Sequence, residues 1–488
     1  MLEASAHRQL KALLLGEGAE RWPHHLTLSR LVARSLRRHD HTLVRLVPGT
    51  DPSWWIGLLV PLALGETPVA LVVSTALRQR LLQVEWPRLQ AVGLSLPCWQ
   101  GATAPPQSQL WLLSHQELLN AWRHGTLAER QLVIPEAEKL EWHLRQAMGI
   151  RLDPQDWDRL RRSQPAAEDS LLELHQRLSQ RIFSHPGHGR QPVALAPEEE
   201  APIRQLLTLL APLPDPWDRW LAAQGEGWCS WAQVDPHLLQ WQGHRQPLAP
   251  LRELKGLLSD RGAILVGELA GSDRAQGPPA SALTLGLNPA AVTVELGDPP
   301  LAEPLPLYAP LRQPLPNSPQ FADHLLDQSR RLVLGQAGLT IVLLDDADLR
   351  RRLTSGLAAE FGSRVGQEST APESNGVICC RWSWWLDHQS RLPQPSQLIV
   401  ALLPIASLED PLTAAQVSEL RRQGRDWFRE LLLPDALNRL QRGLASLRRQ
   451  GGGGRLAVLD GRLRARSWGR QVFSALEPWV QLNRLLPN

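Results

Sequence analysis

Short, largely apolar segments alternate with longer amphipathic segments near both ends of this chain of 488 residues. The first series reads "TLVRLV", "PVALVVST", "QLWLLS" and "QLVI", and the last reads "LTIVLLDD", "GVICC", "QLIVALLP" and "RLAVLDG". A strand that is apolar along its length is buried on both faces, as in a parallel sheet covered by helices on each side. The sequence therefore predicts an α/β protein with two parallel sheets.

The stretch between the two series has a different pattern. It is rich in Arg, Gln, Trp and Pro, and segments such as "DPQDWDRLRR" and "EDSLLELHQRLSQRIF" are typical of surface helices. We expect residues 1–142 and 241–275 to form the first domain, residues 143–240 a helical insertion within it, and residues 282–488 the second domain. A chain of this length exceeds what one hydrophobic core normally serves.

Composition excludes several classes of protein. The four cysteines (Cys98, Cys229, Cys379 and Cys380) have no zinc-finger spacing, so we expect no metal site and a reducing, cytoplasmic environment. The longest apolar run, "WWIGLLVPLALG", is too short to span a bilayer and contains a proline. We also expect no secretory signal at the N-terminus and no membrane partner.

Basic residues are almost all arginines and are concentrated near the C-terminus. Lysine occurs three times among 52 basic residues. Residues 421–470 contain thirteen arginines and four acidic residues, a net charge of +9. Arginines of this density can follow a nucleic-acid backbone, although solvated helix faces give the same composition. The candidate nucleic-acid-binding residues are Arg442, Arg448, Arg455, Arg462, Arg464 and Arg466, with Trp468 as a stacking face.

Several C-terminal motifs have a familiar order and spacing. They are Leu403-Pro404-Ile405, Asp410-Pro411-Leu412, Leu433-Pro434-Asp435-Ala436 and the tail "RLAVLDGRLRARSWG". This segment resembles the DinG/XPD-type branch of superfamily 2 DNA helicases. Upstream, "VPGTDPSWWIGLLVPLAL" aligns without gaps with the family's A-G-T-G-T-G-K-T segment, and "QLVIPEAE" with the strand that ends in D-E-A-H. The resemblance implies two RecA-like domains, ATP and Mg²⁺ as cofactors, and single-stranded DNA or another nucleic acid as partner.

The phosphate-binding loop departs from that family pattern. Such a loop needs a lysine for the phosphates and a hydroxyl for Mg²⁺. Gly49 and Thr50 stand where the loop begins, but Trp54 replaces the lysine and Trp55 replaces the hydroxyl residue. We expect the two indoles to occupy the space of the triphosphate, so that neither ATP nor Mg²⁺ is bound productively.

The other family motifs are also altered. Pro135 replaces the Mg²⁺-orienting aspartate, while Glu136 keeps the position of the catalytic base at a strand end that we expect to face solvent. In motif VI, Q-x-x-G-R-x-x-R becomes Arg442, Ala445, Ser446 and Arg449, so Arg449 alone remains of the two arginines. The lost phosphate and metal contacts together amount to roughly 5–9 kcal/mol. An iron–sulfur cluster of the family type is excluded, because its interval contains Cys98 alone.

Three functions follow from this pattern. The first is a nucleic-acid-binding helicase homologue whose motor is inactive. The second is an active ATP-dependent helicase with an atypical site, which would retain Glu136 as base and Arg449 as finger. The third is an adapter that presents the helicase scaffold to a protein partner.

Overall fold

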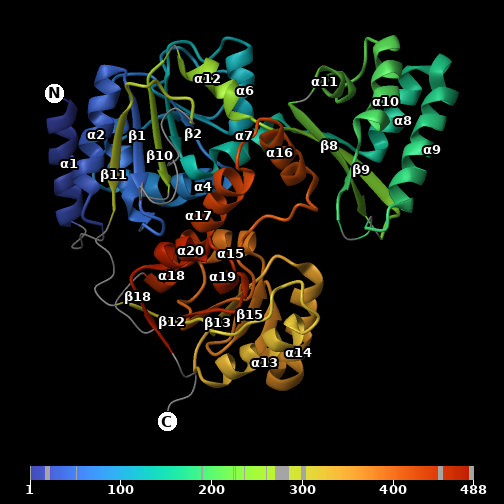
Figure 1. Cartoon of the computed structure of the whole chain (residues 1–488). Helices are drawn as coiled ribbons and strands as arrows, with labels where there is room; N and C mark the ends of the chain where they lie inside the picture. Colours follow the sequence, from blue (N-terminus) through green and yellow to red (C-terminus); the bar gives the residue numbers. More distant parts are fainter. Residues whose placement is uncertain are drawn as a thin grey trace.

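Seven parallel strands form the first sheet, in the order β11-β1-β10-β5-β2-β4-β3 (Figure 1). The computed structural model describes residues 2–16, 22–50, 52–187, 189, 191–223, 225, 227–235, 237–259, 261–269, 285–297, 304–448 and 454–482, without the side chains of residues 253 and 255. The strands are β1 (His41–Leu46), β2 (Val69–Val72), β3 (Cys98–Trp99), β4 (Leu110–Leu113), β5 (Gln131–Pro135), β10 (Ala263–Glu268) and β11 (Val292–Leu296). Strands β1, β2, β4 and β5 are buried throughout, as their apolar sequences predict.

Helices cover both faces of this first sheet. One face packs against α1 (Leu2–Gly16), α2 (His25–Arg38), α3 (Trp55–Leu64), α4 (Thr75–Arg80) and α5 (Trp86–Ala91). The other packs against α6 (His115–Arg123), α7 (Leu140–Met148) and α12 (Leu251–Ser259). The sheet and these helices are called the first lobe below.

A second parallel sheet has the order β14-β15-β13-β16-β17-β12-β18. Its strands are β12 (Leu305–Tyr308), β13 (Thr340–Leu343), β14 (Val365–Gln367), β15 (Val377–Cys380), β16 (Gln397–Val400), β17 (Arg455–Val458) and β18 (Trp479–Gln481). Its helices are α13 (Phe321–Leu334), α14 (Ala347–Phe361), α15 (Trp382–His388), α16 (Pro411–Arg422), α17 (Leu433–Gly443), α18 (Ala445–Arg448), α19 (Arg462–Ala465) and α20 (Gly469–Leu476). This unit is the second lobe, and with it the prediction of two parallel α/β sheets is confirmed.

The insertion lies beside the first lobe and contains both helices and strands (Figure 1). Its helices are α8 (Pro154–Ser163), α9 (Glu168–Ser184), α10 (Pro197–Leu209) and α11 (Trp217–Ala222). They pack on an antiparallel sheet of order β6-β9-β8-β7, formed by Ile150–Leu152, Gln240–Pro247, Trp228–Asp235 and Val193–Ala194. Helices form one layer of the insertion, as predicted, and the antiparallel sheet is a second layer that was not predicted.

Two predicted boundaries also need correction. Strand β11 was expected in the second domain, but it pairs with β1 and completes the first sheet. Residues 241–247 were expected in the first domain, but they belong to β9 of the insertion. Strand β11 pairs with a strand far away in the sequence, which local pattern does not reveal, whereas β9 forms a hairpin with β8 and also pairs with the distant β6. Among the described helices, none has the length and apolarity needed to cross a membrane.

Candidate functional site

A cleft of about 1830 Å³ separates the two lobes. On the first lobe it is lined by the segments that follow β2, β4 and β5, because the carboxyl ends of parallel strands meet at one edge of a sheet. On the second lobe it is lined by residues of α15 and α17. The cleft thus lies where an open α/β sheet normally binds its ligand.

The segment in the phosphate-loop position is closed rather than open. The Thr50 backbone N–H donates to the Val47 carbonyl at 3.0 Å, and the Thr50 hydroxyl donates to the same oxygen at 2.7 Å. Gly49 has a φ of 92°, and a Cβ placed on it would lie 2.4 Å from the Cβ of Ala445. Ala445, at the start of α18, therefore packs directly on the loop, where a phosphate cradle would need open space.

Trp54 and Trp55 do not occupy that space. Their rings stack with centroids 4.5 Å apart and planes at 20°, and the residues are 7% and 3% exposed. Both belong to the hydrophobic core of the first lobe, at the start of α3. The expectation that the two indoles fill the loop was therefore wrong, and the residue that packs against the loop at Gly49 is Ala445 of the second lobe.

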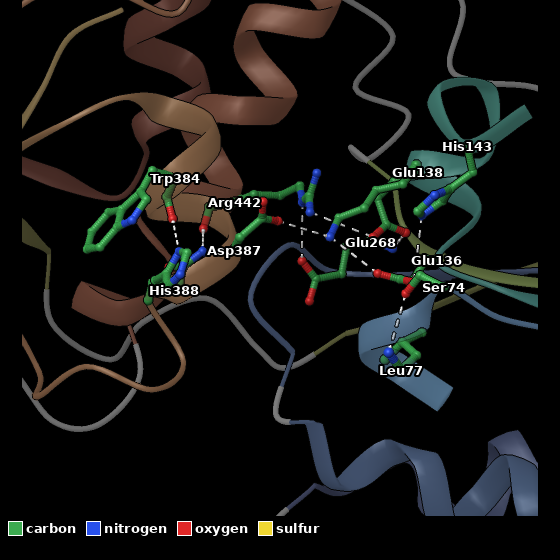
Figure 2. A network of polar contacts seen from close by, with 12 residues as sticks. Ser74, Leu77, Glu136, Glu138, His143, Glu268, Trp384, Asp387, His388 and Arg442 are labelled. Carbon is green, nitrogen blue, oxygen red and sulfur yellow. Dashed lines mark hydrogen bonds and ion pairs between the residues drawn. The ribbon is translucent and has the colours of Figure 1, made fainter. Parts of the chain in front are cut away.

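The acidic segment after β5 is part of a polar network (Figure 2). Glu136 has a left-handed backbone, with φ 59°. Its carboxylate accepts a hydrogen bond from the Ser74 hydroxyl at 2.8 Å and lies 3.3 Å from the Lys139 ammonium. Its side chain is 15% exposed, so the expectation of a solvent-facing glutamate was wrong.

Charged residues of the second lobe meet this segment across the cleft. Arg442 of α17 lies 3.8 Å from a carboxylate oxygen of Glu138 and 3.7 Å from one of Glu268. Lys139 lies 3.6 Å from the Asp387 carboxylate of α15. Burial alone would lower the pKa of Lys139, but the nearby carboxylates outweigh it and raise that pKa. Arg442, predicted as a nucleic-acid contact, instead pairs with acids of the first lobe.

Two stacked histidines adjoin the network. The rings of His115 and His143 have centroids 4.4 Å apart. Burial lowers the pKa of His115 to about 3, and burial also lowers the pKa of His143. Both imidazoles are therefore neutral at pH 7. No group of His, Cys, Asp and Glu in the described part of the chain could hold a metal ion.

Sequence reasoning missed the residues that face the open part of the cleft. Trp142 on α7 is 55% exposed and lines the cleft, as does the exposed Arg391. Arg80 and Arg88 also line the cleft, on the first lobe, and lie 3.1 and 3.5 Å from the buried Glu85 carboxylate. The only local signal for Trp142 was its position on the helix that follows the acidic segment.

Most of the predicted C-terminal arginines have internal contacts instead. Arg448 donates to the carbonyl of Leu476 at 2.8 Å, and Arg455 to that of Leu332 at 2.7 Å. Arg462 pairs with the buried Asp460 at 2.6 Å, and Arg464 donates to the Ala309 carbonyl at 2.9 Å.

The remaining candidates are scattered. Trp468 packs 5.5 Å from Phe428, Arg466 is exposed, and Arg449 lies outside the described residues. The structure does not bring this group together in one groove, because the arginines of highest local density serve the packing of the second lobe.

Comparisons with known proteins find relatives that match part of the sequence and solved structures that share the fold. No family model matches the chain. It is 28% identical over 176 residues to the ATP-dependent DNA helicase YoaA of Escherichia coli (strain K12), covering 34% of this chain and 28% of that protein. It is also 28% identical over 110 residues to YoaA of Haemophilus influenzae, covering 22% of this chain and 17% of that protein. The matched segments thus span less than a third of these relatives.

Solved structures share the whole architecture. The fold is similar to apo XPD, with a TM-score of 0.61 and 11% identity over 93% of this chain and all of that chain. It is also similar to S. tokodaii Xpd4, with a TM-score of 0.60 and 11% identity over 92% of this chain and 97% of that one. The two lobes are therefore RecA-like domains of the XPD arrangement. The sequence similarity to YoaA and the shared fold agree with the predicted resemblance to the DinG/XPD-type superfamily 2 helicases.

Proposed function

We propose that this chain binds nucleic acid between its two lobes and does not turn over ATP. The observation that carries the proposal is the contact of Ala445 with Gly49, which closes the loop where a triphosphate would bind. A nucleotide at this place would also face Glu136, Glu138, Glu268 and Asp387, whose charges Lys139 and Arg442 only partly offset. A triphosphate therefore does not fit the residues present, and no group of His, Cys, Asp and Glu in the described ranges could hold its Mg²⁺.

Two features support the nucleic-acid half of the proposal. The YoaA relatives are DNA helicases by name. The cleft also offers the exposed indole of Trp142, and an aromatic face can stack on any base. Arg391 is exposed on the opposite lobe and pairs with no carboxylate in the described ranges, so its charge is available to a phosphate.

The first experiment measures nucleotide binding. Purified protein is titrated with a fluorescent ATP analogue in the presence of Mg²⁺, and ATP hydrolysis is followed in parallel. We expect neither binding nor hydrolysis. Hydrolysis that disappears in Glu136→Gln would instead establish an active helicase with an atypical site.

The second experiment measures nucleic-acid binding at several salt concentrations. The logarithm of affinity should fall with the logarithm of salt, with a slope of about −0.7 per neutralised phosphate of a single strand. Trp142→Ala should lose about 1–3 kcal/mol of binding if one base stacks there. Trp99→Ala is the matched control, because Trp99 is 42% exposed but is not among the residues that line the cleft. Absence of binding at low salt would refute this half of the proposal and favour a protein adapter.

A further inference from the structure

The two lobes are joined by charged groups at the base of the cleft (Figure 2). The Arg442 side chain is 12% exposed, and that of its partner Glu138 is 7% exposed. The second partner, Glu268, is 24% exposed. Arg442 comes from α17 of the second lobe, whereas both carboxylates come from the first. A buried arginine between two carboxylates of another domain is costly to separate from them, because each charge would be left unpaired.

Neighbouring contacts reinforce this junction. The Asn438 side-chain amide donates to the Glu268 carbonyl at 3.4 Å, one turn of α17 before Arg442. The Glu268 backbone N–H donates to the Glu138 carboxylate at 3.1 Å and fixes its position. Arg442, Glu138, Glu268, Lys139 and Asp387 are called the interlobe cluster below.

A second attachment joins the lobes through the insertion. The Gln191 amide donates to the Glu409 carboxylate at 2.6 Å, and the Gln416 amide donates to the Leu248 carbonyl at 3.3 Å. The Cys229 thiol lies 3.4 Å from the Pro411 carbonyl, at the start of α16. The insertion therefore contacts the second lobe on the side where α16 lies (Figure 1).

We propose that the interlobe cluster holds the two lobes closed without any nucleotide, so that the cleft has one fixed width. The cations of the cluster make the ionic contacts between the lobes themselves, so that no nucleotide is needed to bridge them. Nucleic acid then binds a preformed cleft, and ATP has no effect on its affinity. This last consequence rests on the proposed function, whereas the closed arrangement does not.

The test measures the distance between the lobes without any ligand. Spin labels are attached to cysteines introduced at the exposed positions Arg123 and Arg351, one on each lobe. The background carries Cys98→Ser, since the other three cysteines are buried. We expect one narrow distance distribution, unchanged by ATP and Mg²⁺.

Arg442→Gln should lengthen and broaden that distribution, because Glu138 and Glu268 then lose the positive charge that attracts them to the second lobe. Adding Glu138→Gln to this variant should reverse part of the change. Arg439→Gln is the matched control, since Arg439 lies on the same helix and lines the same cleft but pairs with Asp435 of that helix. It should leave the distribution unchanged.

A distribution for Arg442→Gln identical to that of the wild type would overturn the proposal. Should this variant fail to fold, Asp387→Asn serves instead, because the Asp387 side chain is 61% exposed. It should broaden the distribution less, and no broadening in either variant refutes the proposal. Nucleic-acid affinity should fall about tenfold if the closed population falls to a tenth. Failure of nucleic-acid binding would leave the distance result intact, so the two proposals fail separately.

Discussion

Replacing Gly49 by alanine tests whether the second lobe closes the loop. The new Cβ would lie 2.4 Å from the Cβ of Ala445 and 3.0 Å from its Cα. The backbone φ of 92° adds a second cost, because side chains rarely adopt that conformation. The substitution thus combines a local strain with a clash between the lobes.

The two costs have separate magnitudes. A left-handed backbone costs a non-glycine residue roughly 1–2 kcal/mol. An extra methyl group in a packed contact costs roughly 1–3 kcal/mol. Gly49→Ala should therefore lower the free energy of unfolding by about 2–5 kcal/mol.

Gly93 provides the control that isolates the clash. Its φ is 76°, but no atom lies within 4 Å of a Cβ placed there. Gly93→Ala should therefore show the backbone cost alone, roughly 1–2 kcal/mol. In an Ala445→Gly background the cost of Gly49→Ala should fall to that of Gly93→Ala, because the clashing atom is gone.

Urea unfolding followed by tryptophan fluorescence measures the wild type, Gly49→Ala, Gly93→Ala, Ala445→Gly and the double variant. Equal costs for Gly49→Ala and Gly93→Ala would refute the reasoning, since the contact with Ala445 would then contribute nothing. Such a result would also reopen the loop as a site for phosphate.

Three further predictions concern single side chains. Between pH 6.5 and about 3, His115 is protonated in the unfolded state but not in the folded state. The free energy of unfolding should therefore decrease by roughly 1 kcal/mol for each unit by which the pH is lowered. Urea unfolding of His115→Leu at pH 7, 6 and 5 should show a smaller dependence on pH. Arg448→Met should lose roughly 1–2 kcal/mol of stability in urea unfolding, because the Arg448 guanidinium donates to carbonyls at the end of α20. Its affinity for nucleic acid should be unchanged, and a reduced affinity would show that Arg448 is a binding residue. Glu85→Gln should lower the free energy of unfolding by roughly 1–3 kcal/mol, because the Glu85 carboxylate is 1% exposed and lies between Arg80 and Arg88. An unchanged free energy of unfolding would show that the two ion pairs do not stabilise the fold.

The two sheets could be predicted because their central strands are largely apolar and buried. Edge strands gave no such signal: β3 has two residues, and β14 and β18 have three each. Strands β8 and β9 of the insertion contain glutamines, glycine and proline, so neither alternation nor apolarity marked them. Their pairing stabilises them through contacts that a sequence pattern does not contain.

The sequence predicted which phosphate and metal ligands are missing from the candidate site, but not which residues contact one another there. Trp54 and Pro135 reveal from the sequence alone that phosphate and metal ligands are missing. The partners of charged residues are set by the tertiary fold, so Arg448 and Arg462 were indistinguishable from free arginines until their acceptors were seen. Trp142 was one of 20 tryptophans, and its exposure in the cleft is likewise a tertiary property.

The double attachment of the lobes has a mechanical consequence. Domains that are joined by the linker alone can move independently, whereas these lobes are also connected through the contacts of the insertion with the segment around α16. Breaking the covalent connection between β11 and β12 with an engineered protease site should therefore leave the fragments associated, and they should elute together in size-exclusion chromatography. Separate elution would mean that the peptide bond, and not the contacts, keeps the halves in place.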